Sequence, residues 1–220
     1  MTRLATLLLV VVACRGPSTD ARPSSADSVR ASATRAAYAR GTLLVSADST
    51  MRFAACGTTV ERPVADTPAS RLREAVNAVN GSLRDSLFVE FLADTLDERV
   101  VVRETLFATS LAEGPHCDRP REPFEWVAHG VEPFWRVTFD GTQLVLERPE
   151  PPRELVFDAQ PADVRGALTT VAGTRSLGKV HSLKVGLLRE SCRDGMSDAW
   201  FPFRAEVRVG DVALAGCARR

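Results

Sequence analysis

The chain has 220 residues, and its 28 basic and 28 acidic side chains give a formal net charge of zero at pH 7. A nucleic-acid-binding domain usually needs a basic face, so this balance gives no support to nucleic acid as a partner. About 180 residues follow the N-terminal segment, which is enough chain for one or two small domains.

The N-terminus has the pattern of a secretory signal peptide. Arg3 supplies a positive charge, residues 4–12 are almost wholly apolar, and a small residue follows them. This apolar run is too short to cross a bilayer, because a transmembrane helix needs about 20 apolar residues. Residues 11–14 have the sequence Val-Val-Ala-Cys, which resembles the lipobox of bacterial lipoproteins, although leucine is usual at the first of these positions.

The lipobox resemblance implies that residues 1–13 are removed and that Cys14 carries lipid, which would hold the chain to a membrane. The expected location is the bacterial cell envelope, on the inner or the outer membrane, with the folded part facing the periplasm. The alternative is an ordinary signal peptide or an uncleaved anchor, in which Cys14 has no special role. Residues 14–40 are poor in large apolar side chains, which predicts a flexible linker with at most a weak helix at 28–39.

The four cysteines after Cys14 favour disulfides in an oxidising compartment. Four cysteines allow three pairings, but they fall as two couples, one in each half of the folded chain. We therefore predict the disulfides Cys56–Cys117 and Cys192–Cys217. A metal or redox site is the alternative, and the lack of a C-x-x-C motif and the isolated histidines argue against it. We expect neither a metal ion nor another cofactor.

Residues 41–119 show the element order of a small barrel. Five stretches of apolar residues predict strands, at 42–45, 51–56, 58–64, 87–92 and 99–107. A helix is expected after Ser70, a favourable N-cap, because apolar residues between 72 and 79 fall on one helical face. Three strands, a helix and two strands are the order of the five-stranded OB barrel. Many OB domains bind oligonucleotides or oligosaccharides, which is an analogy of fold and not of site chemistry.

Residues 123–220, after a proline-containing connector, are predicted to form a small antiparallel β-barrel. Alternating apolar residues and tight turns such as Asp140-Gly141 indicate seven or eight short strands. One helical turn is expected at 161–166. The predicted fold class is thus mostly β, with an OB-like domain at 41–119 and an antiparallel barrel domain at 123–220.

Two polar and aromatic clusters are candidates for a ligand site at the mouth of this second barrel, which could receive a small apolar or aromatic ligand. The candidate ligand-binding residues are Glu132, Phe134, Trp135, Asp194, Met196, Asp198 and Trp200. In the alternative interpretation Trp135 belongs to the core and the loop at 194–198 is a turn held by the disulfide. No nucleophile and base occur in a recognisable catalytic pattern, so we expect no enzymatic activity.

Two motifs carry a resemblance to known families. Residues 130–135, Gly-Val-Glu-Pro-Phe-Trp, together with the Cys-Arg-Asp-Gly-Met-Ser-Asp run at 192–198, are similar to a family of uncharacterised bacterial envelope lipoproteins. The first half, with Phe-Ala-Ala-Cys-Gly at 53–57, resembles the C-terminal OB domain of the NlpE lipoproteins. The chain lacks the C-x-x-C motif that NlpE proteins carry in another domain, which argues against copper handling.

The function that we expect is that of a non-enzymatic, membrane-anchored envelope lipoprotein that binds a cell-wall, lipid or protein partner. One alternative is a module that resembles lysozyme inhibitors or senses envelope stress. A second alternative is an envelope hydrolase that uses scattered carboxylates such as Glu132 and Asp198.

Overall fold

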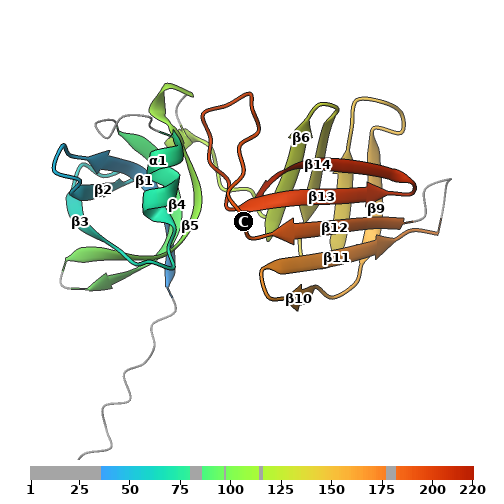
Figure 1. Ribbon diagram of the computed structural model, residues 1–220, viewed down its shortest axis with the longest axis horizontal. Helices are drawn as coiled ribbons and strands as arrows, with labels where there is room; N and C mark the ends of the chain where they lie inside the picture. The colour runs from blue at the N-terminus through green and yellow to red at the C-terminus, as the bar shows by residue number, and fades with distance from the viewer. Residues whose placement is uncertain (1–35, 80–85, 97, 114–115, 177–181) are drawn as a thin grey trace, which may run out of the picture. The chain divides into compact units, whose positions relative to one another are not determined.

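The computed structural model of the chain shows two β-barrels joined by a connector, residues 119–125 (Figure 1). The residues that the structure describes are 36–79, 86–96, 98–113, 116–176 and 182–220. The predicted signal peptide, Cys14 and most of the predicted linker lie outside them. Both barrels belong to one compact unit, Thr34–Arg220. Among the described residues, no helix has the length and apolar character needed to cross a membrane.

The first barrel confirms the OB prediction. Its strands close in the order β1-β2-β3-β5-β4, and β4 pairs back onto β1. Helix α1 lies between β3 and β4 in the sequence, and β3 pairs with β5 in parallel. The elements are β1 (Ala37–Val45), β2 (Met51–Ala55), β3 (Glu61–Asp66), α1 (Leu72–Val79), β4 (Leu87–Leu96) and β5 (Arg99–Ser110), followed by short 3-10 turns at Leu111–Glu113 and His116–Asp118.

Helix α1 begins as the sequence predicts. The buried Ser70 Oγ accepts a hydrogen bond from the Leu72 backbone N–H at 3.1 Å, which satisfies one of the amides that a helix start leaves open. Leu72, Ala75 and Val76 form the buried face of the helix and pack into the core of the first barrel.

The second barrel confirms the predicted antiparallel barrel. Eight strands close a ring in the order β11-β12-β13-β14-β6-β7-β8-β9, and the short β10 pairs with β11 outside this ring. The strands are β6 (Trp126–Val131), β7 (Phe134–Phe139), β8 (Gln143–Glu147), β9 (Glu154–Ala159), β10 (Asp163–Arg165), β11 (Leu168–Thr174), β12 (Ser182–Leu188), β13 (Phe203–Val209) and β14 (Val212–Arg219).

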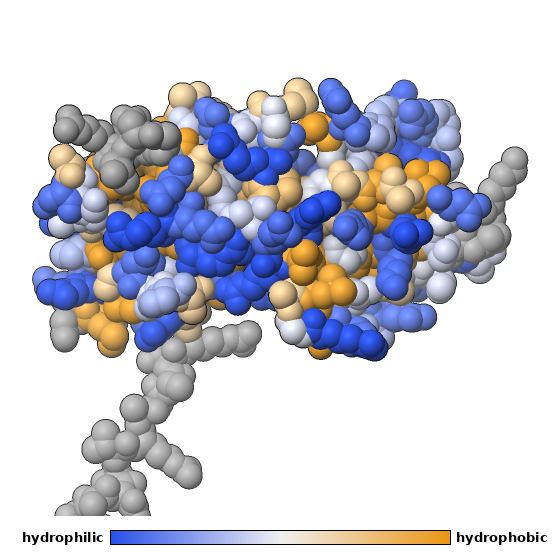
Figure 2. Space-filling view, in the orientation of Figure 1, coloured by the Kyte–Doolittle hydropathy of each residue, from blue (hydrophilic) through white to orange (hydrophobic). Residues whose placement is uncertain are grey.

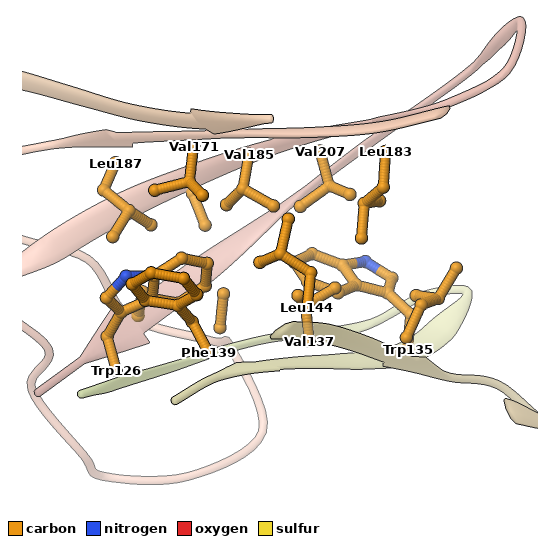
Figure 3. Close-up of a cluster of buried hydrophobic side chains, with 14 of the residues drawn as sticks. Trp126, Trp135, Val137, Phe139, Leu144, Val171, Leu183, Val185, Leu187 and Val207 are labelled. Carbon is orange, nitrogen blue, oxygen red and sulfur yellow. The ribbon is translucent and has the colours of Figure 1, made fainter. Parts of the chain in front are cut away.

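The interior of the second barrel is filled with side chains. Alternate residues of several strands point inward, as along β13, where every second residue is buried. Figure 3 shows side chains from opposite walls meeting in this core, with Trp126 and Trp135 on one side and Val185 and Leu183 on the other. Burial of such apolar surface is the main stabilising term of a fold of this size.

The Gly-x-Glu-Pro-Phe-Trp motif forms the β6–β7 hairpin and has a packing role. Gly130 pairs with Trp135, and a Cβ added at Gly130 would overlap the indole Nε1 of Trp135. A Cβ at Gly216 of β14 would press on the His129 carbonyl and on the same indole. Both glycines therefore leave the space that the buried ring occupies. The conformation of these strands does not require glycine, but the close approach of the ring does.

Both predicted disulfides are present. Cys56–Cys117 ties the end of β2 to the turn before the connector, with the two Cα atoms 5.4 Å apart. Cys192–Cys217 ties the β12–β13 loop, residues 189–202, to β14, with the two Cα atoms 5.5 Å apart. Each bridge closes a loop in the unfolded chain, which stabilises the folded state by roughly 3–4.5 kcal/mol in the chain-entropy model.

Two local predictions are wrong. The predicted helical turn at 161–166 is instead strand β10, because residues 163–165 pair with β11 through a tight turn at Gly166, whose φ is +60°. The predicted weak helix at 28–39 does not extend to its end, because Ala37–Ala39 belong to β1 and pair with β4. Residues 28–35 lie outside the described part. The sequence analysis also missed strand β6.

Candidate functional site

A cavity of about 410 Å³ lies between the two barrels. Residues from β1, β4 and β5 contribute to one side of it, and residues from β6, β7, β14 and the β12–β13 loop contribute to the other. The connector also lines it. A volume of this size falls in the range of small-molecule sites, roughly 300–1,000 Å³.

Arginines dominate the charged lining of the cavity. Two acidic side chains, Glu90 and Glu122, accompany them. The six arginines that line the cavity are Arg40, Arg119, Arg121, Arg136, Arg219 and Arg220. Arginine stays protonated in proteins, so this side-chain set carries a net positive charge at any physiological pH.

Two of the six arginines belong to an ion-pair network that links both barrels. Arg136 of β7 contacts Glu147 of β8, with Nη1 and Oε2 3.0 Å apart, and also Glu122 of the connector. Arg219 of β14 contacts Glu90 of β4, with Nη1 and Oε2 3.2 Å apart, and Glu122 at 3.6 Å. The Glu90 carboxylate is buried, so Arg219 supplies the charge that its burial requires.

Three further arginines of the lining, on β1 and the connector, have no acidic partner in the described part of the chain. Arg40 donates from Nη1 to the Arg119 carbonyl at 2.5 Å and from Nη2 to the Cys117 carbonyl at 3.2 Å. Arg121 lies over the Tyr38 ring, 4.1 Å from its centroid. Within the described ranges, Arg40, Arg119 and Arg121 form no ion pair with a carboxylate.

Tyr38, beneath Arg121, remains a neutral phenol. Burial and then the negative charge of Glu90 raise the pKa of Tyr38 to about 12. The Tyr38 hydroxyl and the Glu90 carboxylate interact by charge but do not meet with hydrogen-bond geometry.

A row of aromatic rings runs along the cavity. The His116 ring stacks on Phe88 with centroids 4.8 Å apart, and Phe88 contacts Phe107 at 6.5 Å. Phe107 contacts Phe201 at 5.4 Å, and His129 meets Phe201 at 4.8 Å. These rings give the cavity apolar walls beside its guanidinium groups.

His129 and Asp194 hold the base of the β12–β13 loop. The His129 Nε2 lies 3.5 Å from Asp194 Oδ2, and Asp194 Oδ1 accepts hydrogen bonds from the amides of Met196 and Ser197. Burial opposes ionisation of Asp194, but its hydrogen bonds outweigh burial and leave its pKa below the usual value. Burial lowers the pKa of His129, and the opposing effect of Asp194 is smaller.

The lowered pKa of His129 predicts a stability loss in mild acid. Because the unfolded histidine, with a pKa of about 6.5, takes up a proton more readily than folded His129, stability should fall as the pH drops below about 6.5. His129→Gln should lose less stability than wild type between about pH 7 and pH 5, as measured by urea unfolding. A His129 pKa above 6.5 in an NMR titration would contradict this expectation.

The structure does not bring the seven candidate ligand-binding residues together. Trp135 is buried in the core of the second barrel, and Trp200 is fully buried in the core of the first. The interpretation that these rings line a barrel mouth is therefore wrong, because each fills a packed core. Phe134, with 55% of its surface exposed, is the candidate that lines the cavity.

The other four candidates lie at the surface or in a turn. Glu132 is exposed beside the β6–β7 turn, and Met196 has 77% of its surface exposed on the β12–β13 loop. Asp194 shapes that loop, which agrees with the alternative of a turn held by the disulfide. Asp198 is exposed, and its carboxylate lies 4.0 Å from Arg193. Among the described residues, no group of three or more His, Cys, Asp or Glu side chains is placed to hold a metal ion.

Sequence reasoning missed the arginines of the cavity. They come from β1, the connector, β7, β14 and the residue after β14, and no local pattern connects them. The closely spaced charges of residues 119–122, Arg-Pro-Arg-Glu, are the one sequence feature that points to the cavity lining. Figure 2 shows a hydrophilic band on one face of the folded chain, with apolar residues in smaller separate groups.

Comparison of the chain with protein-family models, with curated proteins and with solved structures finds no match.

Proposed function

We propose that this chain is a non-enzymatic lipoprotein of the bacterial cell envelope, which binds a small envelope ligand in the cavity between its two barrels. The ligand would carry an acidic group and an apolar part. The observation that supports this is the lining of the cavity, where six arginines and two carboxylates lie beside a row of aromatic rings.

Each part of the lining favours one part of such a ligand. Guanidinium groups form charge-assisted hydrogen bonds with acidic oxygens and present several N–H donors in a planar array. The exposed Phe134 ring offers apolar contact area that water solvates poorly. Arginine stays protonated at neutral pH, so the six guanidinium groups are suited to hold an anion and not to transfer a proton.

Binding of a simple aromatic anion tests this proposal. By isothermal titration calorimetry of the full chain in nonionic detergent, naphthalene-1-sulfonate should bind, whereas 1-naphthylmethylamine, a cation with the same rings, should not. Arg121→Gln and Phe134→Ala should each weaken binding of the sulfonate by about tenfold, since each removes one kind of contact. The matched controls are Arg165→Gln and Val164→Ala on β10, where both side chains are exposed and outside the cavity.

Equal binding of the anion and the cation would contradict the proposal. Sulfonate binding that none of the cavity variants changes would also contradict it, because the anion would then bind elsewhere.

The anchoring part of the proposal depends on Cys14, which lies outside the described residues. Cys14→Ser should move the protein from the membrane pellet to the soluble fraction or leave it unprocessed, because the lipid cannot be attached. Fractionation with mass spectrometry of the product checks this. A mature, membrane-bound protein with an unmodified Cys14 would show that the lipobox interpretation is wrong.

A further inference from the structure

We infer that the acidic group of the ligand is a phosphate monoester, held by Arg40, Arg119 and Arg121 on the connector side of the cavity. This inference rests on the proposed function, because it specifies the ligand of the same cavity.

The positive and negative charges of the cavity lining do not balance. Six guanidinium groups line the cavity, and the three carboxylates that pair with them, Glu90, Glu122 and Glu147, contact only Arg136 and Arg219 among the described arginines of the lining. The guanidinium groups therefore exceed these carboxylates by three charges, and four of them, on Arg40, Arg119, Arg121 and Arg220, have no acidic partner among the described residues. A phosphate monoester carries a charge of about −1.5 to −2 at pH 7, whereas a carboxylate or a sulfate ester carries about −1. The phosphate offsets more of the excess.

Two of the three arginines that would hold the phosphate, Arg40 and Arg121, are held in place. Arg40 is fixed by two hydrogen bonds to the backbone at Cys117 and Arg119, and Cys117 is itself fixed by its disulfide to Cys56. Arg121 is fixed over the Tyr38 ring. Side chains that are already ordered lose less conformational entropy when a ligand binds.

Several N–H donors of these arginines remain available to a ligand. Arg40 uses Nη1 and Nη2 once each, so part of its array of five N–H groups stays available. Arg119 and Arg121 add two further guanidinium groups on the same segment of chain. A phosphate group presents three terminal oxygens as acceptors, and planar guanidinium groups match their spacing.

The phosphorylated ligand has two sources that share this chemistry: the headgroup of a lipid or a soluble phosphate monoester. Phe124 and Phe134, which also line the cavity, would contact the remainder of either.

Calorimetry of the full chain in nonionic detergent tests the inference with three probes. The probes are phenyl phosphate, phenyl sulfate and dihexanoyl phosphatidic acid. Phenyl phosphate should bind at least about tenfold more tightly than phenyl sulfate, because the two share a ring and differ in charge. In the double variant Arg119→Gln/Arg121→Gln, the ratio of the affinities for phenyl phosphate and phenyl sulfate should fall close to one. In the control Arg165→Gln, this ratio should stay unchanged.

The outcomes separate the inference from the proposed function. Tighter binding of the short-chain phosphatidic acid than of phenyl phosphate supports the inference with a lipid headgroup as the source. Equal or weaker binding of that lipid, with the phosphate preference intact, supports it with a soluble monoester. Phenyl sulfate binding as tightly as phenyl phosphate overturns the inference, while naphthalene-1-sulfonate binding still supports the proposed function. If neither the sulfonate nor phenyl phosphate binds, both are overturned.

Discussion

Trp200→Ala should lower the free energy of unfolding by about 3–5 kcal/mol, because it empties a site inside a packed core. Trp200 belongs to the β12–β13 loop, yet its fully buried ring packs into the core of the first barrel beside residues of β1, β4 and β5. Its backbone pairs with Ala108 of β5 through hydrogen bonds of 2.8 and 3.3 Å. Its indole Nε1 donates to Ser191 Oγ at 2.5 Å.

The loss of stability should appear in the first barrel, although Trp200 follows strand β12 of the second barrel in the sequence. Hydrogen exchange should speed up in β1, β4 and β5, and urea unfolding should give the free energy. Met196→Ala in the same loop is the matched control, and its side chain is exposed, so its effect should stay within about 0.5 kcal/mol. A loss below about 1 kcal/mol for Trp200→Ala, or faster exchange confined to the loop, would show that Trp200 does not complete this core.

Arg219→Met should lower the free energy of unfolding by about 3–5 kcal/mol, because it leaves a buried carboxylate without its cation. Glu90, whose side chain is only 8% exposed, loses its ion pair in this variant. Methionine retains part of the apolar contact that Arg219 makes over the Phe107 ring, where the guanidinium carbon lies 4.7 Å from the centroid. Loss of the positive charge of Arg219 is therefore the main effect of this substitution on stability. Urea unfolding gives the free energy.

Two further variants separate this charge effect from general disruption. Glu90→Gln combined with Arg219→Met should recover most of the stability, because no buried charge is then left unpaired. Arg52→Met removes an ion pair to Glu61 in which both side chains are well exposed, and it should cost less than about 1 kcal/mol. If Arg219→Met costs no more than Arg52→Met, Glu90 does not depend on Arg219.

The residues that carried the family resemblance have packing and turn roles in the structure. Gly130 and Trp135 form a recognisable motif because a buried indole needs space that only glycine leaves. Asp194 is set in a recognisable run because it holds the turn after Cys192. A recognisable local pattern can thus reflect packing.

The sequence by itself determined the two barrels, the helix start at Ser70 and both disulfides. These features depend on short-range signals: the alternation of apolar residues, turn residues such as Asp140-Gly141, and cysteines that fall in separate halves. Only the tertiary structure decided where Trp200 packs and which arginines line the cavity, because residues far apart in the chain make both. A ring from the β12–β13 loop completes the first core, and β1, the connector and β14 bring their guanidinium groups together only when both barrels are closed.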